Sequence, residues 1–172
     1  MPTLILGGAR SGKSGHAQRL AEASGLAVTL IATARAGDEE MRARIARHRS
    51  ERPPHWNTVE EPLALAEALA AGAETGRFLV VDCLTLWLLN VLEAGEAVFR
   101  RERAALLAIL PELPGRLALV ANEVGLGVIP LGELSRRFVD EAGRLNQDLA
   151  RVANEVVFVA AGLPLTLKGR MA

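Results

Sequence analysis

The residues with the clearest chemical potential form a glycine-rich loop near the N-terminus. Residues 7–14 read Gly-Gly-Ala-Arg-Ser-Gly-Lys-Ser, a full match to the phosphate-binding motif G-x-x-x-x-G-K-[ST]. In this motif the glycines let backbone N–H groups wrap an anion, the lysine bridges the outer phosphates and the last hydroxyl ligates magnesium. We therefore predict a nucleotide site with Lys13 as a catalytic residue, Ser14 as the metal ligand, and contacts from Gly7, Gly8, Ala9, Arg10, Ser11, Gly12, Lys13 and Ser14.

Lysine is scarce in this chain, which makes the motif more informative. Of the 20 basic residues only Lys13 and Lys168 are lysines, and the rest are arginines. A match to a motif that requires lysine is therefore not expected to arise by chance in this sequence. The alternative is a glycine-rich turn that binds no ligand.

The elements that must position this loop alternate between strand and helix. Apolar runs bounded by turn residues predict buried parallel strands at 3–6, 27–31, 78–81, 117–121 and 156–160, and helical spacing predicts helices at 14–23, 38–49, 62–71, 96–110 and 131–154. The alternation predicts an α/β architecture of three layers, a P-loop NTPase (RecA-like) fold with a mostly parallel sheet. Residues 163–167 predict an antiparallel edge strand whose pairing is limited by Pro164. We expect ligands at the carboxyl ends of the strands.

Length and composition define the class of protein. The chain has 172 residues, half of them apolar, so we expect one compact domain over residues 1–172, which includes the nucleotide-binding motif, and not a disordered chain. Twenty basic and twenty acidic residues balance, which argues against a nucleic-acid-binding protein. The single cysteine, Cys83, cannot form an internal disulfide, and we find no export signal or membrane-spanning run. These features predict a cytoplasmic protein.

A carboxylate at the end of a neighbouring strand often supports the Mg²⁺ shell in P-loop enzymes. Asp82 directly follows the predicted strand 78–81 and is the main candidate, although it could instead cap a helix that begins near Leu84. Asn122 and Glu123, which end another strand, are weaker candidates. The base-reading motif N-K-x-D of signalling GTPases is absent from the sequence.

An arginine-rich segment follows the second predicted strand. Residues 42–52 contain five arginines, one histidine and one glutamate, which could form either a solvated helix face or a phosphate-binding patch. His48 could complement a helix C-terminus or act as a nucleophile toward phosphorus. We expect structural roles for His16 and His55 and a packing role for Cys83.

Taken in order, these motifs resemble one known family. The ordered set comprises residues 7–14, Ile-Ala-Thr-Ala at 31–34, Asp-Glu-Glu-Met at 38–41, Arg44-Ile45 followed by His48, Arg-Pro-Pro-His-Trp at 52–56, Asn-Glu-Val-Gly-Leu-Gly at 122–127 and Gly-Arg-Leu-Asn-Gln at 143–147. In this respect the chain resembles the bifunctional adenosylcobinamide kinase / adenosylcobinamide-phosphate guanylyltransferase family of cobalamin biosynthesis. The resemblance spans nearly the whole chain.

The resemblance implies two activities. The enzyme would phosphorylate adenosylcobinamide with ATP or GTP in the presence of Mg²⁺, and then transfer GMP from GTP, through a guanylylated histidine, to give adenosylcobinamide-GDP and pyrophosphate. That histidine corresponds to His48. Besides residues 7–14, the nucleotide contacts it implies are Ala32, Thr33, Ala34, Arg49, Ser50, Glu51, Arg52, Glu60 and Asp82. Relatives form trimers.

The sequence departs from the family pattern at one position and leaves two assignments open. Arg47 stands where relatives often carry a second histidine. Asp82 occupies a position that can be glutamate in relatives, and a one-residue alignment shift would replace Glu60 by Glu61. Two rival interpretations are a monofunctional P-loop kinase for another small alcohol and a nucleotide-dependent regulatory protein.

Overall fold

The structure is a computed structural model that describes residues 1–35, 37, 39–50 and 53–169. Within the helix at 39–50, it does not describe the side chains of Met41, Arg44, Arg47, His48 and Ser50. Among the predicted site residues, Glu51 and Arg52 therefore lie outside the described residues, and His48 and Ser50 have only their backbone described.

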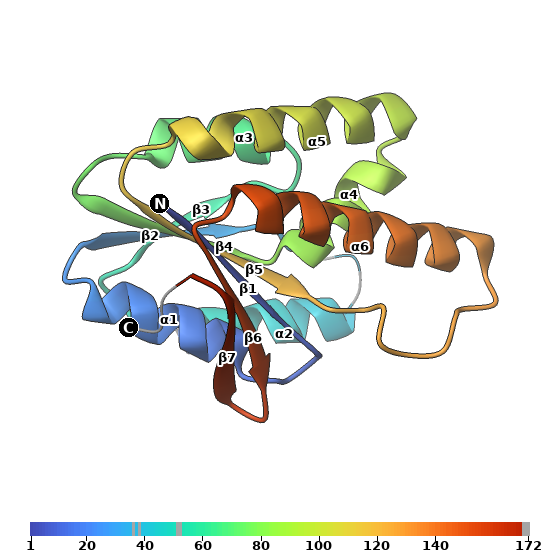
Figure 1. The fold of residues 1–172 in the computed structure, drawn as a ribbon, viewed down its shortest axis with the longest axis horizontal. Helices are drawn as coiled ribbons and strands as arrows, with labels where there is room; N and C mark the ends of the chain where they lie inside the picture. The colour runs from blue at the N-terminus through green and yellow to red at the C-terminus, as the bar shows by residue number, and fades with distance from the viewer. Residues whose placement is uncertain (36, 38, 51–52, 170–172) are drawn as a thin grey trace.

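One seven-stranded sheet forms the centre of the molecule (Figure 1). Its strands are β1 (Pro2–Gly7), β2 (Ala27–Ala32), β3 (Asn57–Glu60), β4 (Arg77–Asp82), β5 (Arg116–Asn122), β6 (Glu155–Ala160) and β7 (Leu163–Lys168). They lie in the order β3-β2-β4-β5-β1-β6-β7. All neighbouring strands are parallel except β6 and β7, which pair antiparallel. The predicted mostly parallel sheet with an antiparallel edge strand is confirmed.

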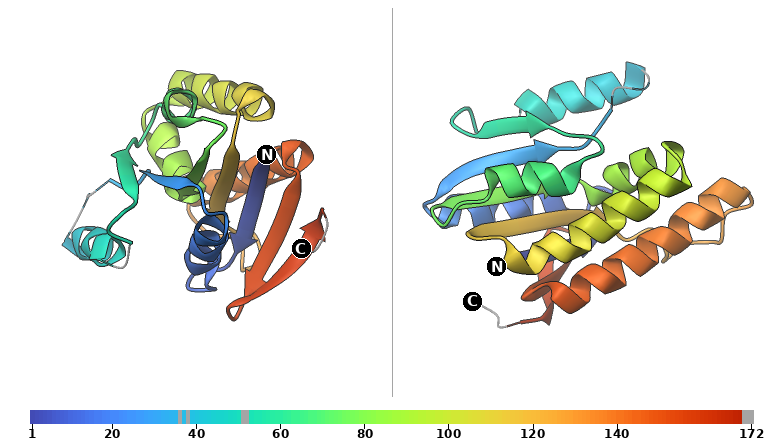
Figure 2. Two further views of the ribbon diagram at one scale, coloured as in Figure 1. Left: turned by 90° about the vertical axis from the view of Figure 1, so that its left-hand side faces the viewer. Right: turned by 90° about the horizontal axis from the view of Figure 1, so that it is seen from above.

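Helices cover both faces of this sheet. They are α1 (Lys13–Ala23), α2 (Glu39–Ser50), α3 (Leu65–Gly72), α4 (Leu84–Glu93), α5 (Glu96–Ile109) and α6 (Glu133–Val152), with a short 3₁₀ helix, η1 (Leu110–Glu112), after α5. Side chains of α3, α4, α5 and α6 form the larger core with one face, whereas α1 packs on the other. Figure 2 shows α2 on the same side as α1, beside the β3 edge. The three-layer α/β prediction is thus confirmed.

Three local differences from the predictions have physical causes. Strand β3 was not predicted because all four of its residues are exposed and give no apolar run. The sequence indicates helix α4 only as the helix near Leu84 that Asp82 could cap. Its residues are apolar nearly all round, so they show no apolar stripe at helical spacing. Helix α3 begins at Leu65 and not at Pro62, because the Glu61 carboxylate accepts hydrogen bonds from the N–H groups of Leu63 and Ala64, both at 2.8 Å.

Among the helices of the described residues, none is both long enough and apolar enough to cross a membrane.

Candidate functional site

The phosphate-binding loop lies between β1 and α1, as the sequence predicts. Gly12 adopts φ 99°, a left-handed conformation that favours glycine, and directly precedes α1. A Cβ on Gly7 would lie 2.3 Å from the carbonyl oxygen of Val159, so no side chain fits there. Lys13 is buried, and its Nζ donates a hydrogen bond to the carbonyl oxygen of Gly8 at 2.6 Å. The loop is therefore held with its lysine folded along the backbone that would cradle phosphates.

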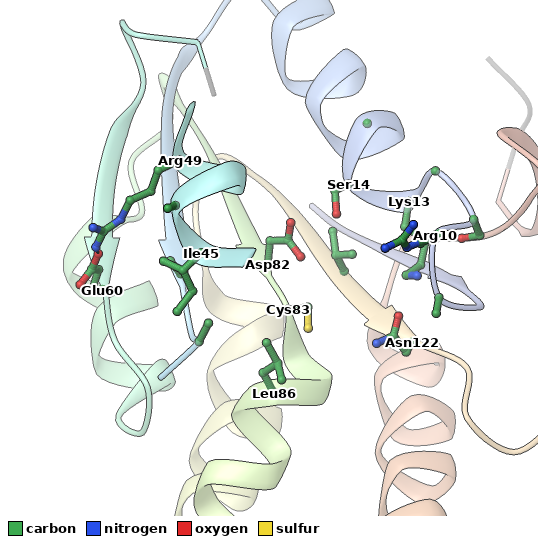
Figure 3. A pocket seen from close by; sticks show the side chains of 18 of the residues that line it. Arg10, Lys13, Ser14, Ile45, Arg49, Glu60, Asp82, Cys83, Leu86 and Asn122 are labelled. Carbon is green, nitrogen blue, oxygen red and sulfur yellow. The ribbon is translucent and has the colours of Figure 1, made fainter. Parts of the chain in front are cut away.

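A cavity of about 580 Å³ opens beside this loop, along the carboxyl ends of the parallel strands (Figure 3). It is lined by Ala9, Arg10, Ser11, Gly12, Lys13, Ser14, Gly15, Ala32, Ala34, Arg42, Ile45, Ala46, Arg49, Glu60, Asp82, Cys83, Leu86, Val120 and Asn122. The structure thus brings together eleven of the predicted site residues: Ala9 to Ser14, Ala32, Ala34, Arg49, Glu60 and Asp82. This is the position at which a three-layer α/β fold is expected to bind its ligand.

Thr33 is a predicted nucleotide contact whose hydroxyl has hydrogen-bond partners within the fold. Its side chain is fully buried and does not line the cavity. The hydroxyl donates to the carbonyl oxygen of Cys83 at 2.7 Å and accepts from the Cys83 N–H at 3.1 Å. The Asn90 side-chain amide in turn donates to the carbonyl oxygen of Thr33 at 2.8 Å. Thr33 therefore joins the ends of β2 and β4, and its nucleotide contact stays a prediction.

Gly7 and Gly8 likewise do not line the cavity. Gly7 pairs with Asn122 in the sheet, and Gly8 offers its carbonyl oxygen to Lys13. Both glycines shape the loop from behind.

Asp82 ends β4 and lines the cavity. The alternative that it caps α4 is wrong, because the residue preceding that helix is Cys83 and no side chain caps its N-terminus. Figure 3 shows the Asp82 carboxylate and the Ser14 hydroxyl facing the same space. A hydroxyl and a carboxylate are hard oxygen ligands of the kind that Mg²⁺ prefers, and Mg²⁺ usually completes its shell with substrate phosphates and water. The residues present therefore fit a magnesium–nucleotide complex.

The end of the cavity farthest from the loop carries an ion pair. Arg49 of α2 bonds Glu60 at the end of β3, and both side chains are more than half exposed. Glu60 lines the cavity, whereas Glu61 bonds the backbone that leads into α3. Of these two neighbouring glutamates, Glu60 is therefore the one that lines the cavity, and its nucleotide contact stays a prediction.

Helix α2 supplies more of the lining than the sequence indicated. Arg42, Ile45 and Ala46 join Arg49 there, so the helix forms a wall of the cavity. His48 lies in the last turns of this helix, between Ala46 and Arg49 along the chain. The arginine-rich segment is therefore part of the site and not only a solvated face.

Other lining residues were missed or ranked low. Asn122 was a weaker candidate, and its place at the end of β5 was the available signal. Cys83 packs against the smaller core as expected, but it also lines the cavity. Burial raises the pKa of its thiol to about 11, helped by the Asp82 carboxylate, so the thiol is protonated at neutral pH. Gly15, Leu86 and Val120 carried no sequence signal.

The two remaining histidines lie apart from the cavity lining. His16 belongs to α1, where burial and then the Arg19 charge lower the pKa of its imidazole. His55 is exposed in the turn before β3. The structural roles predicted for them stay predictions.

A glycine-rich loop between a buried strand and a helix, a buried lysine and a cavity at the carboxyl ends of parallel strands together define a P-loop nucleotide-binding protein. The sequence model of the family described as cobinamide kinase / cobinamide phosphate guanyltransferase matches residues 3–167, and the chain belongs to this family. The resemblance drawn from the ordered motifs is confirmed.

Curated relatives agree with this assignment. The chain is 63% identical over 170 residues to the bifunctional adenosylcobalamin biosynthesis protein CobP of Pseudomonas aeruginosa, with 98% of each chain covered. It is 40% identical over 182 residues to the bifunctional adenosylcobalamin biosynthesis protein CobU of Escherichia coli, covering 98% of this chain and all of that protein. One solved structure is similar in fold, and it is described as a structural study of PH0250 from Pyrococcus horikoshii OT3. The TM-score is 0.55, and the match covers 99% of this chain and 87% of that one. At 10% sequence identity the likeness shows the fold alone.

Proposed function

We propose that this chain catalyses both reactions in the family's name. It phosphorylates the hydroxyl of adenosylcobinamide with a nucleoside triphosphate, and it then transfers GMP from GTP to the resulting phosphate, giving adenosylcobinamide-GDP and pyrophosphate. The observation that carries the proposal is that one cavity connects the P-loop to the arginine-bearing wall of α2. A nucleotide bound in it has its phosphates on the loop and its α-phosphate toward the helix that carries His48.

In the kinase step, the substrate hydroxyl oxygen attacks the γ-phosphorus. The bond from this phosphorus to the β–γ bridging oxygen breaks, and the hydroxyl proton is released. Lys13 and the backbone N–H groups of the loop hold the phosphates and stabilise the charge that develops on them. No side chain needs to form a bond to phosphorus in this step, so positioning and charge account for the catalysis.

In the guanylyl step, a ring nitrogen of His48 forms a bond to the α-phosphorus of GTP. The bond to the α–β bridging oxygen breaks, and pyrophosphate leaves. A phosphate oxygen of adenosylcobinamide phosphate then bonds the same phosphorus while the phosphorus–nitrogen bond breaks. An imidazole suits this role because it is a good nucleophile near neutral pH and leaves readily once protonated. Arg49 and Arg42 bring positive charge to the same wall of the cavity.

Mg²⁺, together with ATP or GTP, completes the proposed set of reactants. Ser14 is the proposed protein ligand of the metal, with Asp82 facing the same space. When bound, Mg²⁺ neutralises charge on the phosphates. Arg49, Ser50, Glu51, Arg52 and Glu60 are proposed nucleotide contacts at the α2 end on the strength of the family resemblance, and Arg49 and Glu60 also line the cavity.

We further infer a single catalytic domain over residues 1–172, a cytoplasmic location and a homotrimer. The one continuous sheet supports the single domain. The proposed need for nucleoside triphosphates supports the cytoplasmic location, because that is where these nucleotides are supplied. The trimer rests on family resemblance alone, and analytical ultracentrifugation tests it. The balanced charge speaks against nucleic acid as a partner.

Labelling with radioactive GTP tests the proposed function. Incubation with Mg²⁺ and GTP labelled at the α-phosphate is expected to attach label to the protein, and a phosphorus–nitrogen bond survives alkali and is lost in acid. GTP labelled at the γ-phosphate is the control and is expected to leave no label. A monofunctional kinase or a nucleotide switch predicts no stable label with either nucleotide.

A further inference from the structure

Five exposed apolar side chains lie together between β5 and the first turn of α6. They are Leu126, Val128, Ile129, Leu131 and Leu134, and we refer to residues 126–134 as the apolar segment. Val128 and Leu131 are each 97% exposed, so neither contributes to the core. An exposed group of large apolar side chains on a soluble protein commonly marks a binding surface.

Hydrogen bonds hold this segment in a defined shape. Arg136 of α6 donates from its guanidinium to the carbonyl oxygen of Pro130, at 3.4 Å, and to that of Leu131. Its backbone N–H also donates to the carbonyl oxygen of Gly132 at 3.0 Å. At the other end, the Glu123 carboxylate accepts from the Gly125 N–H at 2.8 Å. The exposed side chains are therefore presented by an anchored backbone.

The chain enters the apolar segment from β5, whose last residue lies where the cavity meets the P-loop. Asn122 lines the cavity, and the N–H of the next residue, Glu123, donates to the carbonyl oxygen of Gly7 at 3.0 Å. The chain then passes beyond the carboxyl ends of β5 and β1 before it enters α6 (Figure 1). The other end of the cavity, at Glu60, is three strands away in the sheet from β5. The segment thus follows, along the chain, the strand end that lies at the phosphate end of the cavity.

Phosphoryl transfer requires the acceptor hydroxyl to approach the outermost phosphate. A cavity of about 580 Å³ has the size of a site for one small ligand, such as a nucleotide. An adenosylated corrin macrocycle does not fit beside a nucleotide in that space, so its ring must lie outside the cavity while its hydroxyl-bearing arm enters. Besides its amide side chains, such a ring carries methyl groups, and apolar side chains at the entrance are suited to contact those methyl groups.

We propose that the apolar segment binds the corrin ring of the acceptor and delivers its alcohol arm to the P-loop end of the cavity, past Asn122. The proposal rests on the proposed function, which supplies a corrinoid acceptor. Val128 and Leu131 are the principal contacts because they are the most exposed apolar side chains of the segment. They determine which acceptor binds, and they take no part in bond formation.

A second set of exposed apolar side chains provides a matched control. Leu165 and Leu167 lie on β7, the outer edge strand of the sheet, and neither of them lines the cavity. A substitution on β7 removes a similar area of exposed apolar surface. None of the residues of this strand lines the cavity. A general effect of lost surface hydrophobicity would therefore be seen in both variants, and an acceptor-specific effect in only one.

The test compares the double variant Val128→Ser/Leu131→Ser with Leu165→Ser/Leu167→Ser. In the first, we expect the KM for adenosylcobinamide in the kinase reaction to rise at least about tenfold, because two apolar contacts are lost. Its labelling by α-labelled GTP is expected to remain normal, because that half-reaction contains no corrinoid. The β7 variant is expected to match the parent chain in both assays.

Three results would overturn the inference. One is an unchanged KM for adenosylcobinamide in the first variant, and another is an equal rise in the β7 variant. The third is a change of oligomeric mass in the first variant, measured by sedimentation, because the segment would then be covered by a second copy of the chain. Failure of the proposed function is distinguished from these results by the labelling assay. In that case the parent chain itself would take no label from α-labelled GTP.

Discussion

The backbone N–H of Gly162 donates a hydrogen bond to the carbonyl oxygen of Ser11, at 2.8 Å. Gly162 lies in the two-residue turn between β6 and β7, whereas Ser11 lies in the phosphate-binding loop. A Cβ on Gly12 would lie 3.0 Å from the Cα of Gly162, so the two backbones are in close contact. The antiparallel hairpin at the end of the chain therefore supports the loop from the side away from the cavity.

This contact predicts that the turn conformation affects nucleotide binding. Gly162 has φ 79°, which asparagine tolerates and a β-branched residue does not, and a Cβ there would meet no atom within 4 Å. We expect Gly162→Val to shift the turn and raise the KM for GTP about tenfold, with a smaller effect on kcat. Gly162→Asn is expected to keep both values near those of the parent. Steady-state kinetics, at a temperature where both variants are folded, measure the KM for GTP and kcat. Equal KM values in the two variants would contradict the predicted role of the turn.

The two lysines of the chain provide a second matched pair. We expect Lys13→Ala to lower kcat for phosphoryl transfer by about 100- to 1000-fold, with an unchanged circular dichroism spectrum, because its ammonium serves the phosphates. Lys168 donates to the carbonyl oxygens of Ala150, Arg151 and Ala153 at 2.8, 3.0 and 2.7 Å, and so caps the C-terminal end of α6. Lys168→Ala is expected to cost about 1 kcal/mol of stability and leave kcat unchanged. The reverse pattern would remove the P-loop from the mechanism.

Ser14 tests the proposed metal ligand. We expect Ser14→Ala to move the Mg²⁺ dependence of the kinase reaction to higher concentration, since one oxygen ligand is lost. Ser24→Ala is a suitable control because Ser24 lies at the far end of α1, where its hydroxyl donates to the carbonyl oxygen of Ala21 at 2.5 Å. A Mg²⁺ titration of initial rates distinguishes the two variants. An unchanged titration for Ser14→Ala would count against the ligand role.

The thiol of Cys83 is expected to be unreactive at neutral pH although it lines the cavity. Burial and the Asp82 carboxylate raise its folded-state pKa to about 11, from a model-peptide value of 9.0. Because the protonated thiol is neutral, this shift stabilises the fold below about pH 9, and the contribution is lost as the pH rises toward 11. Iodoacetamide alkylation followed by mass spectrometry is expected to be slow at pH 7.5 and to accelerate toward pH 11. Rapid alkylation at pH 7.5 would be inconsistent with this environment.

Much of the fold could be predicted because its signals are local. The apolar runs that became β1, β2, β4, β5 and β6 are buried on both faces, and burial on both faces produces the continuous runs that were recognised. The exposed edge strand β3 is defined only by pairing with β2, which no local pattern reveals. Helix α4 was also hard to predict, because it lies between the sheet and the neighbouring helices and is therefore apolar nearly all round.

The site could be predicted where one motif specifies both a residue and its partner. The spacing in the P-loop fixes Lys13 and Ser14 relative to the loop backbone, and the structure agrees. A resemblance gives a residue number for Thr33 but no direction for its side chain, and only the structure shows its hydroxyl bonded to the Cys83 backbone across two strands. The contribution of Asn122 depends on β5 lying beside β1, a relationship that only the sheet order reveals.

Covalent labelling of His48→Ala tests the central claim most directly, because only a protein nucleophile distinguishes this enzyme from other P-loop kinases. The variant and the parent chain are incubated with Mg²⁺ and α-labelled GTP, and His16→Ala and His55→Ala serve as controls. We predict that His48→Ala binds GTP, takes no label and retains measurable kinase turnover, while both controls are labelled normally. Retained labelling of His48→Ala would contradict the account and move the nucleophile to another histidine. Loss of both activities with intact GTP binding would instead make His48 a positioning residue.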